Sequence, residues 1–136
     1  MPKILGLNLI GVLAASVAFY FVGFLWYGLL FAEAWQTAEG IVAADVEGDS
    51  PLYMVGGFLI TLLQVIGLGL VMKWKGDATP AAGATTAAVL WFFLALPFVH
   101  YAYLYSVDHS VTLLMIDLSH LFVGWVVAAV VLRLIK

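Results

Sequence analysis

The chain lacks cysteine altogether, which excludes disulfides, thiolate metal sites and iron–sulfur ligation. It is also poor in charge, because only 10% of its 136 residues are charged and only five of these are Lys or Arg. So few basic residues, together with a net charge of −3, argue against nucleic acid as a partner. What the chain has instead is 65% hydrophobic residues, too many for a water-soluble domain of this size. The composition therefore predicts that it lies in a lipid bilayer.

The few charges are distributed along the chain in a pattern that predicts topology. The basic residues lie in three short segments, namely the N-terminus, a central loop and the C-terminus: Lys3, Lys73, Lys75, Arg133 and Lys136. Six of the eight acidic residues lie in the two segments between them: Glu33, Glu39, Asp45, Glu47, Asp49 and Asp108. Because clustered Lys and Arg mark cytoplasmic loops, both termini are expected in the cytoplasm, which requires an even number of spans.

Four long apolar stretches separate these charged segments and predict an all-α, polytopic membrane protein with four transmembrane helices in a compact bundle. We expect the helices at about residues 5–31, 51–72, 80–104 and 111–133, within a single domain of residues 1–136. Each is long enough to cross a hydrocarbon core of about 30 Å. The external loop, residues 32–50, is predicted to contain a short interfacial helix from Ala34 that ends at Gly40. The predicted location is the inner (cytoplasmic) membrane.

Residues that favour helix starts and breaks occur at the expected boundaries. Thr79-Pro80 offers an N-cap and a first-turn proline for the third helix, and Asp108 or Ser110 could cap the fourth. Pro97 lacks a backbone N–H and is expected to kink the third helix.

Small residues recur at a four-residue spacing in three of the predicted helices, where they would let helix backbones approach closely. The pairs are Gly11 with Ala15, Gly83 with Ala87, and Gly124 with Ala128. Such seams serve either packing within one bundle or contacts between chains, and the sequence leaves both open. Besides the lipid bilayer, the expected partner is therefore a second copy of the chain or a larger membrane complex.

The fourth helix carries the strongest polar signal. Asp117 and His120 share one face and are expected about 9 Å and about 14 Å below the outer end of that helix. A carboxylate near the middle of a membrane helix costs about 2.5–3.5 kcal/mol on insertion scales, so it usually has a partner or a task. His100 in the third helix, and Gln64 with Thr61 in the second, could converge on this pair.

Several interpretations of this polar group are open. It could be a hydrogen-bonded clasp that only fixes how the helices pack. Asp117, His120 and Gln64 could instead form a polar or proton path. A metal or haem site built from His100, His120 and Asp117 is also chemically plausible, since two His and a carboxylate are common ligands. No catalytic motif is visible, so neither a catalytic residue nor a resident cofactor is predicted.

A motif of five spaced residues lies at the end of the first predicted span: Gly23, Trp26, Tyr27, Phe31 and Trp35. This motif resembles one in a bacterial membrane family catalogued only as domain of unknown function 1761. Members of that family are similarly short and have about four spans. In their last helix a polar residue, often Asn, precedes an aromatic residue or His by three positions, which is the place of Asp117 and His120. The resemblance implies fold and compartment, but no activity.

The sparse polar loops, the small-residue seams and the lack of a catalytic motif favour a non-enzymatic structural or accessory component. Such a protein would self-associate or pack in a larger membrane complex. The alternative is a small transporter or channel. A hydrated cavity reaching Asp117 from the outside would favour this alternative over a structural role. A membrane metal or haem site is the second alternative.

Overall fold

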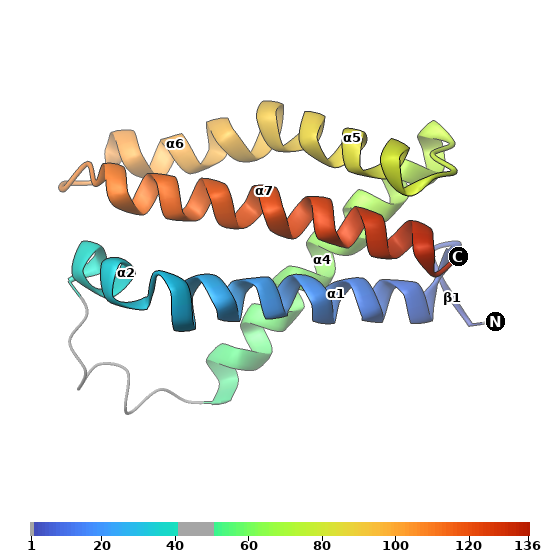
Figure 1. Cartoon of the computed structure of the whole chain (residues 1–136), viewed down its shortest axis with the longest axis horizontal. Helices are drawn as coiled ribbons and strands as arrows, with labels where there is room; N and C mark the ends of the chain where they lie inside the picture. The colour runs from blue at the N-terminus through green and yellow to red at the C-terminus, as the bar shows by residue number, and fades with distance from the viewer. Residues whose placement is uncertain (1, 41–50) are drawn as a thin grey trace.

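The computed structural model describes residues 2–40 and 51–136 and contains four long helical spans, of which one crosses the others obliquely (Figure 1). Each is long and apolar enough to cross a membrane, as predicted. The first span is α1 (Leu9–Gly23) continued by the π-helical segment η1 (Phe24–Leu30), and the second is α4 (Pro51–Lys75). The third is α5 (Pro80–Leu90), the π-helical segment η2 (Trp91–Ala95) and α6 (Leu96–Tyr105), and the fourth is α7 (Val111–Leu134).

The first helix begins later than the predicted residue 5. The preceding residues instead form a small antiparallel hairpin of β1 (Lys3–Ile4) and β2 (Leu7–Asn8). Its turn has positive φ angles, 51° at Leu5 and 81° at Gly6, which a helix does not allow. The side chain of Asn8 then caps α1 by accepting from the backbone N–H of Ile10 at 3.0 Å.

The short helix predicted after the first span is α2 (Ala32–Glu39). It ends at Gly40, whose φ of 71° provides a left-handed C-cap and whose N–H donates to the carbonyl of Thr37. The rest of the predicted external loop, with Asp45, Glu47 and Asp49, lies outside the described residues.

Local sequence explains where the third and fourth spans begin and where the third is interrupted. The Thr79 side chain accepts from Ala82 N–H at 3.1 Å, and that of Ser110 from Leu113 N–H at 3.1 Å. Near Pro97 the third span departs from α-helical hydrogen bonding. The π-helical segment η2 lies just before the proline. Proline has no N–H and its ring excludes the carbonyl four residues back, so the α pattern cannot continue unbroken there.

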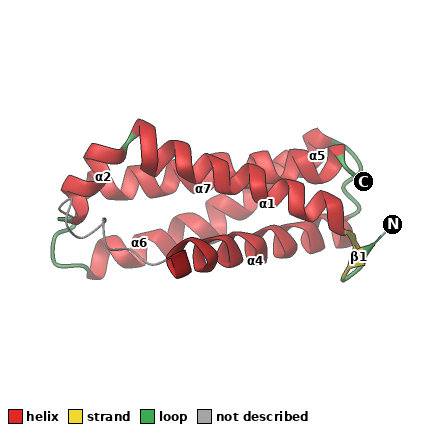
Figure 2. Cartoon of the chain, turned by 90° about the horizontal axis from the view of Figure 1, so that it is seen from below, coloured by secondary structure: helices red, strands yellow, loops and turns green. Residues whose placement is uncertain are grey.

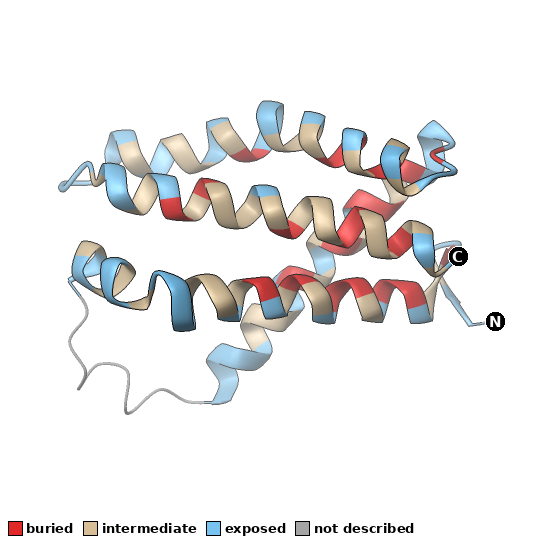
Figure 3. Cartoon of the chain, in the orientation of Figure 1, coloured by how far each residue is buried: buried red, intermediate tan, exposed pale blue. Residues whose placement is uncertain are grey.

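The buried core lies toward the end of the bundle that carries both termini, which we call the basal end (Figure 3). The opposite end, with α2 and the turn between α6 and α7, is the distal end. α7 packs between α1 and α5, and α4 crosses behind them (Figures 1 and 2). The core side chains come from all four spans and from β2: Leu7, Val12, Ala15, Phe19, Val65, Leu68, Met72, Ala87, Ala128, Ala129 and Leu132.

The small-residue seams are used within the chain. A methyl group added to Gly124 would lie 2.3 Å from Cε1 of Phe19, so the Phe19 ring packs directly on the α7 backbone. A methyl group on Gly11 would lie 2.5 Å from the carbonyl oxygen of Ile135, and one on Gly83 would lie 2.7 Å from Cε of Met72. These glycines therefore allow close approach between helices of one bundle.

Candidate functional site

The predicted pair on the fourth span and the motif on the first span meet in the distal half. Asp117 and His120 lie on α7, three residues apart and hence on the same side of the helix. Trp26 and Tyr27 lie in η1 on the neighbouring span. A π-helical turn shifts the positions of the side chains that follow it, and such turns are frequent at functional sites.

Two consecutive motif residues bind two polar residues of α7. The Tyr27 hydroxyl donates a hydrogen bond to Oδ1 of Asp117. Next to it, Nε1 of Trp26 donates to Oγ of Ser119 at 2.9 Å. Sequence reasoning overlooked Ser119, although a serine between Asp117 and His120 in an otherwise apolar helix was a visible signal. The Trp-Tyr pair thus joins the first span to the last through two polar contacts.

His120 is held by ring contacts. Its imidazole lies edge-on to the Tyr27 ring, with centroids 5.0 Å apart, and tilted against Phe19 at 5.6 Å. A methyl group on Gly23 would lie only 3.2 Å from Nε2 of His120, so glycine there leaves room for the imidazole. Within residues 2–40 and 51–136, no hydrogen bond reaches either His120 ring nitrogen.

The last two motif residues complete the same cluster. Trp35, on α2, packs edge-on against Tyr27 with centroids 5.4 Å apart. Phe31 packs against Trp26 at 5.8 Å. All five motif positions therefore surround or support the contact with α7, and α2 closes it from the distal side.

Two cavities adjoin this cluster. One, of about 260 Å³, lies at the distal end and is lined by Asp117, Glu39 and Asp108 together with side chains of α6. The other, of about 370 Å³, is lined by Tyr27, His120 and Thr61. The hydrogen bond between Tyr27 and Asp117 joins a wall of one cavity to a wall of the other. No Lys or Arg lines either cavity in the described part of the chain.

The structure does not bring Gln64 or His100 to the Asp117–His120 pair, which corrects the expected convergence. Gln64 accepts from Nε1 of Trp125 at 2.9 Å, beside a separate apolar cavity. His100 instead bonds through Nδ1 to the carbonyl of Leu96 at 2.7 Å, one turn back on its own helix. Both side chains are therefore hydrogen-bonded to groups other than Asp117 and His120. Of the residues expected to converge, only Thr61 lies with His120 on a shared cavity.

The ligand set predicted for a metal site, His100 with His120 and Asp117, is therefore not assembled. Among residues 2–40 and 51–136, no three His, Asp or Glu side chains form a group that could hold a metal ion. The position of His100 explains this for the predicted ligand set, because its ring faces Tyr103 at 6.2 Å and its Nδ1 is taken by a backbone carbonyl.

Comparison with known protein families finds one that matches most of the chain. The family model described as "Protein of unknown function (DUF1761)" matches residues 10–133, which include the whole motif and both Asp117 and His120. No curated protein and no solved structure matches the chain.

Proposed function

The chain belongs to the DUF1761 family of unknown function, and we propose that it is a small membrane transporter that moves protons or small cations past Asp117. The observation that carries this proposal is the hydrogen bond between Tyr27 and Asp117, with a cavity on either side of it. A cavity that reaches Asp117 from the distal end is the feature that distinguishes transport from a closed packing clasp.

The proposed orientation puts the distal cavity outside and the basal end in the cytoplasm of a bacterial inner membrane. Four basic residues surround one cavity at the basal end, from both terminal segments and from the end of α4: Lys3, Lys73, Arg133 and Lys136. Clustered Lys and Arg favour the cytoplasmic side. Glu33 and Glu39 of α2 lie at the opposite end, on the proposed outer side.

The chemistry of the distal cavity favours a positive substrate. Three carboxylates line it, from Glu39, Asp108 and Asp117, and a cavity lined by one sign of charge concentrates ions of the other sign. Ionisable residues within a membrane span are rare and commonly mark ion or proton paths. Tyr27 touches both Asp117 and His120, so the proposed path runs from Asp117 through Tyr27 to the His120 cavity, and not through Gln64.

The same geometry favours a carrier over an open channel. Below His120, the Phe19 ring rests on Gly124 and is almost fully buried at 2% exposure. The core at the basal end continues from there. A substrate that reached the His120 cavity would need Phe19 to move before it could continue. Transport would therefore proceed through a rearrangement between α1 and α7.

The test is flux in vesicles reconstituted with purified protein. An imposed membrane potential should drive proton uptake, read by an internal pH dye, in the wild type and not in Asp117→Asn. The matched control is Ser119→Ala, which removes the neighbouring hydrogen bond to Trp26 without touching the carboxylate. If wild-type vesicles show no more flux of protons or small cations than empty ones, and both variants only lower the melting temperature, the polar cluster is a packing clasp.

A structural or accessory role in an oligomer or a larger membrane complex is the second candidate. The observation that favours it is the start of α4, where Leu52, Tyr53 and Met54 are between 66% and 75% exposed. In Figure 1 this end of α4 diverges from the other helices. The seams at Gly11, Gly83 and Gly124 no longer support it, because they are filled within the chain. A strictly monomeric, partner-free particle in native mass measurement would count against this role.

A further inference from the structure

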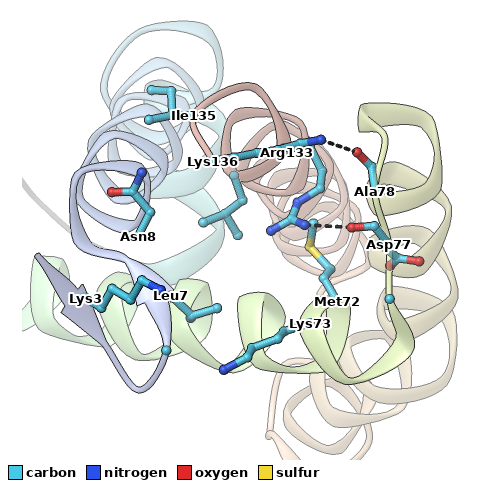
Figure 4. Close-up of a pocket in the computed structure, with 13 residues that line it drawn as sticks. Lys3, Leu7, Asn8, Met72, Lys73, Asp77, Ala78, Arg133, Ile135 and Lys136 are labelled. Carbon is cyan, nitrogen blue, oxygen red and sulfur yellow. Dashed lines mark hydrogen bonds between the residues drawn. The ribbon is translucent and has the colours of Figure 1, made fainter. Parts of the chain in front are cut away.

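A third cavity lies at the basal end, far from the Tyr27–Asp117 contact. Its volume is about 460 Å³, and its walls come from the β1–β2 hairpin, the end of α4, the turn before α5 and the end of α7 (Figure 4). Segments from both ends of the sequence and from its middle therefore build it. The proposed transport path does not use it.

Its lining is strongly basic. Lys3, Lys73, Arg133 and Lys136 all line the cavity, and the single acidic side chain among the lining residues is that of Asp77. That carboxylate is already bound, by Nζ of Lys75 at 2.9 Å and by the Thr86 hydroxyl. The pair of Lys75 and Asp77 is the only ion pair between described residues. None of the four cations of the cavity therefore forms an ion pair with an acidic side chain within residues 2–40 and 51–136.

Several of these cations are held in place by the backbone. Nη1 of Arg133 donates to the carbonyl of Asp77 and Nζ of Lys136 to that of Ala78, both at 2.7 Å (Figure 4). Nζ of Lys73 rests on the hairpin turn, where a methyl group added to Gly6 would lie 2.0 Å from it. The cations are thus pre-positioned, although like charges around one cavity repel one another.

One donor in this group points to a missing acceptor. Nε of Arg133 is buried and has no hydrogen-bond partner in the described part of the chain. Burying a donor unpaired is unfavourable, so such atoms usually have a partner. A group with several negatively charged oxygens would compensate the charge of this guanidinium and of the surrounding ammonium groups. Phosphate is such a group, and Arg and Lys side chains commonly bind it.

The neighbouring surface indicates where that phosphate comes from. At the same end of the bundle, Leu5, Trp74 and Leu134 are 66% to 74% exposed, as side chains facing lipid are. Trp is enriched where a membrane span meets the headgroups. Basic pockets between spans on the cytoplasmic side bind anionic headgroups. We propose that the basal cavity binds the phosphate of an anionic phospholipid, whose acyl chains lie against the apolar surface beside it.

The test compares two adjacent lysines. Lys73→Gln removes a cation that lines the cavity, whereas Lys75→Gln removes one that does not line it and whose charge is already paired with Asp77. Delipidated protein in neutral detergent is titrated with phosphatidylglycerol or phosphatidylcholine, and bound lipid is counted by native mass spectrometry. The wild type should bind phosphatidylglycerol at least about tenfold more tightly than phosphatidylcholine. Lys73→Gln should lower that affinity about fivefold, and Lys75→Gln should leave it within about twofold.

A third arm uses inorganic phosphate alone. It should bind far more weakly than phosphatidylglycerol and should not displace it. Equal binding of the two lipids would overturn the proposal, as would equal losses in the two lysine variants, since these indicate only a diffuse positive surface. Displacement of the lipid by inorganic phosphate would assign the cavity to a soluble ligand. Circular dichroism of both variants shows that the helices are intact.

Discussion

The basal half of the bundle is packed around Phe19, Met72 and Leu132, whereas in the distal half no residue of η1, α2 or α6 is buried (Figure 3). The spans are regular α-helices in the basal half, and both π-helical segments lie on its distal side. The distal half, in turn, holds the Tyr27–Asp117 contact and the two cavities beside it. Packing and polar chemistry are therefore separated along the bundle.

This separation fits the proposed transport, which requires part of the bundle to move. Segments with few buried contacts open at low free-energy cost, and functional elements are commonly drawn from them. In the proposed transport cycle, η1 and the distal part of α7 would rearrange easily, whereas moving Phe19 off Gly124 would be the costly step. The predictions below test this difference between the packed basal half and the polar distal half, from the largest expected effect to the smallest.

Gly124→Ala should have the largest effect on stability. The added methyl group would lie 2.3 Å from Cε1 of Phe19, which is buried and cannot move aside freely. Overpacking of this kind should lower the free energy of unfolding by about 2–3 kcal/mol. Unfolding in detergent measures it. The control is Gly67→Ala on α4, where nothing lies within 4 Å. Equal losses in the two variants would contradict the idea of a tightly packed basal half.

Tyr27→Phe should lower the free energy of unfolding less than Gly124→Ala does, but it should have the larger effect on flux. It leaves Oδ1 of Asp117 without its donor, at a cost of about 1–2 kcal/mol. Trp26→Phe removes the neutral bond to Ser119 and keeps an aromatic ring beside Phe31, and an interhelical bond of this kind averages about 0.6 kcal/mol in membranes. Flux should fall in Tyr27→Phe and persist in Trp26→Phe. Identical behaviour of the two in both assays would mean that the distal contacts only hold helices together.

Acid stability should depend on the basal end. The Thr86 hydroxyl and, next, Lys75 hold the pKa of the Asp77 carboxyl below its usual value of 3.8. The folded state thus favours the charged form, so its contribution is complete above pH 3.8 and disappears as the pH falls through the folded pKa. Thr86→Val should weaken this dependence. Melting temperatures at pH 6 and at pH 3 measure it, and an unchanged difference in the variant would rule out this origin.

Features set by local sequence could be predicted. Hydropathy and charge located the four spans, Thr79 and Ser110 cap helices as expected, and Gly40 ends the short helix α2. The start of the first helix was predicted too early, because the apolar run continues through a hairpin that depends on positive φ angles at Leu5 and Gly6. Hydropathy does not distinguish such a turn from a helix.

Pairings between spans were harder to predict. Tyr27 and Asp117 are 90 residues apart, and their meeting depends on how each helix is rotated about its axis. The sequence placed Asp117 and His120 on one side of α7, but the π-helical turns of η1 decide which side chain of the first span faces them. The same uncertainty in rotation led to the prediction that Gln64 would face Asp117.

Gln64→Leu should therefore have the smallest effect on stability and flux. It tests whether the proposed path avoids Gln64. Gln64 accepts from Nε1 of Trp125 beside an apolar cavity, so its loss should cost about 0.6 kcal/mol. Flux should be unchanged, because the proposed path runs through Tyr27 and His120. Thr61→Val, on the cavity shared with His120, is the paired variant that should reduce flux. If Gln64→Leu abolishes flux and Thr61→Val does not, the path crosses α4 at Gln64, and the distal cluster is a clasp.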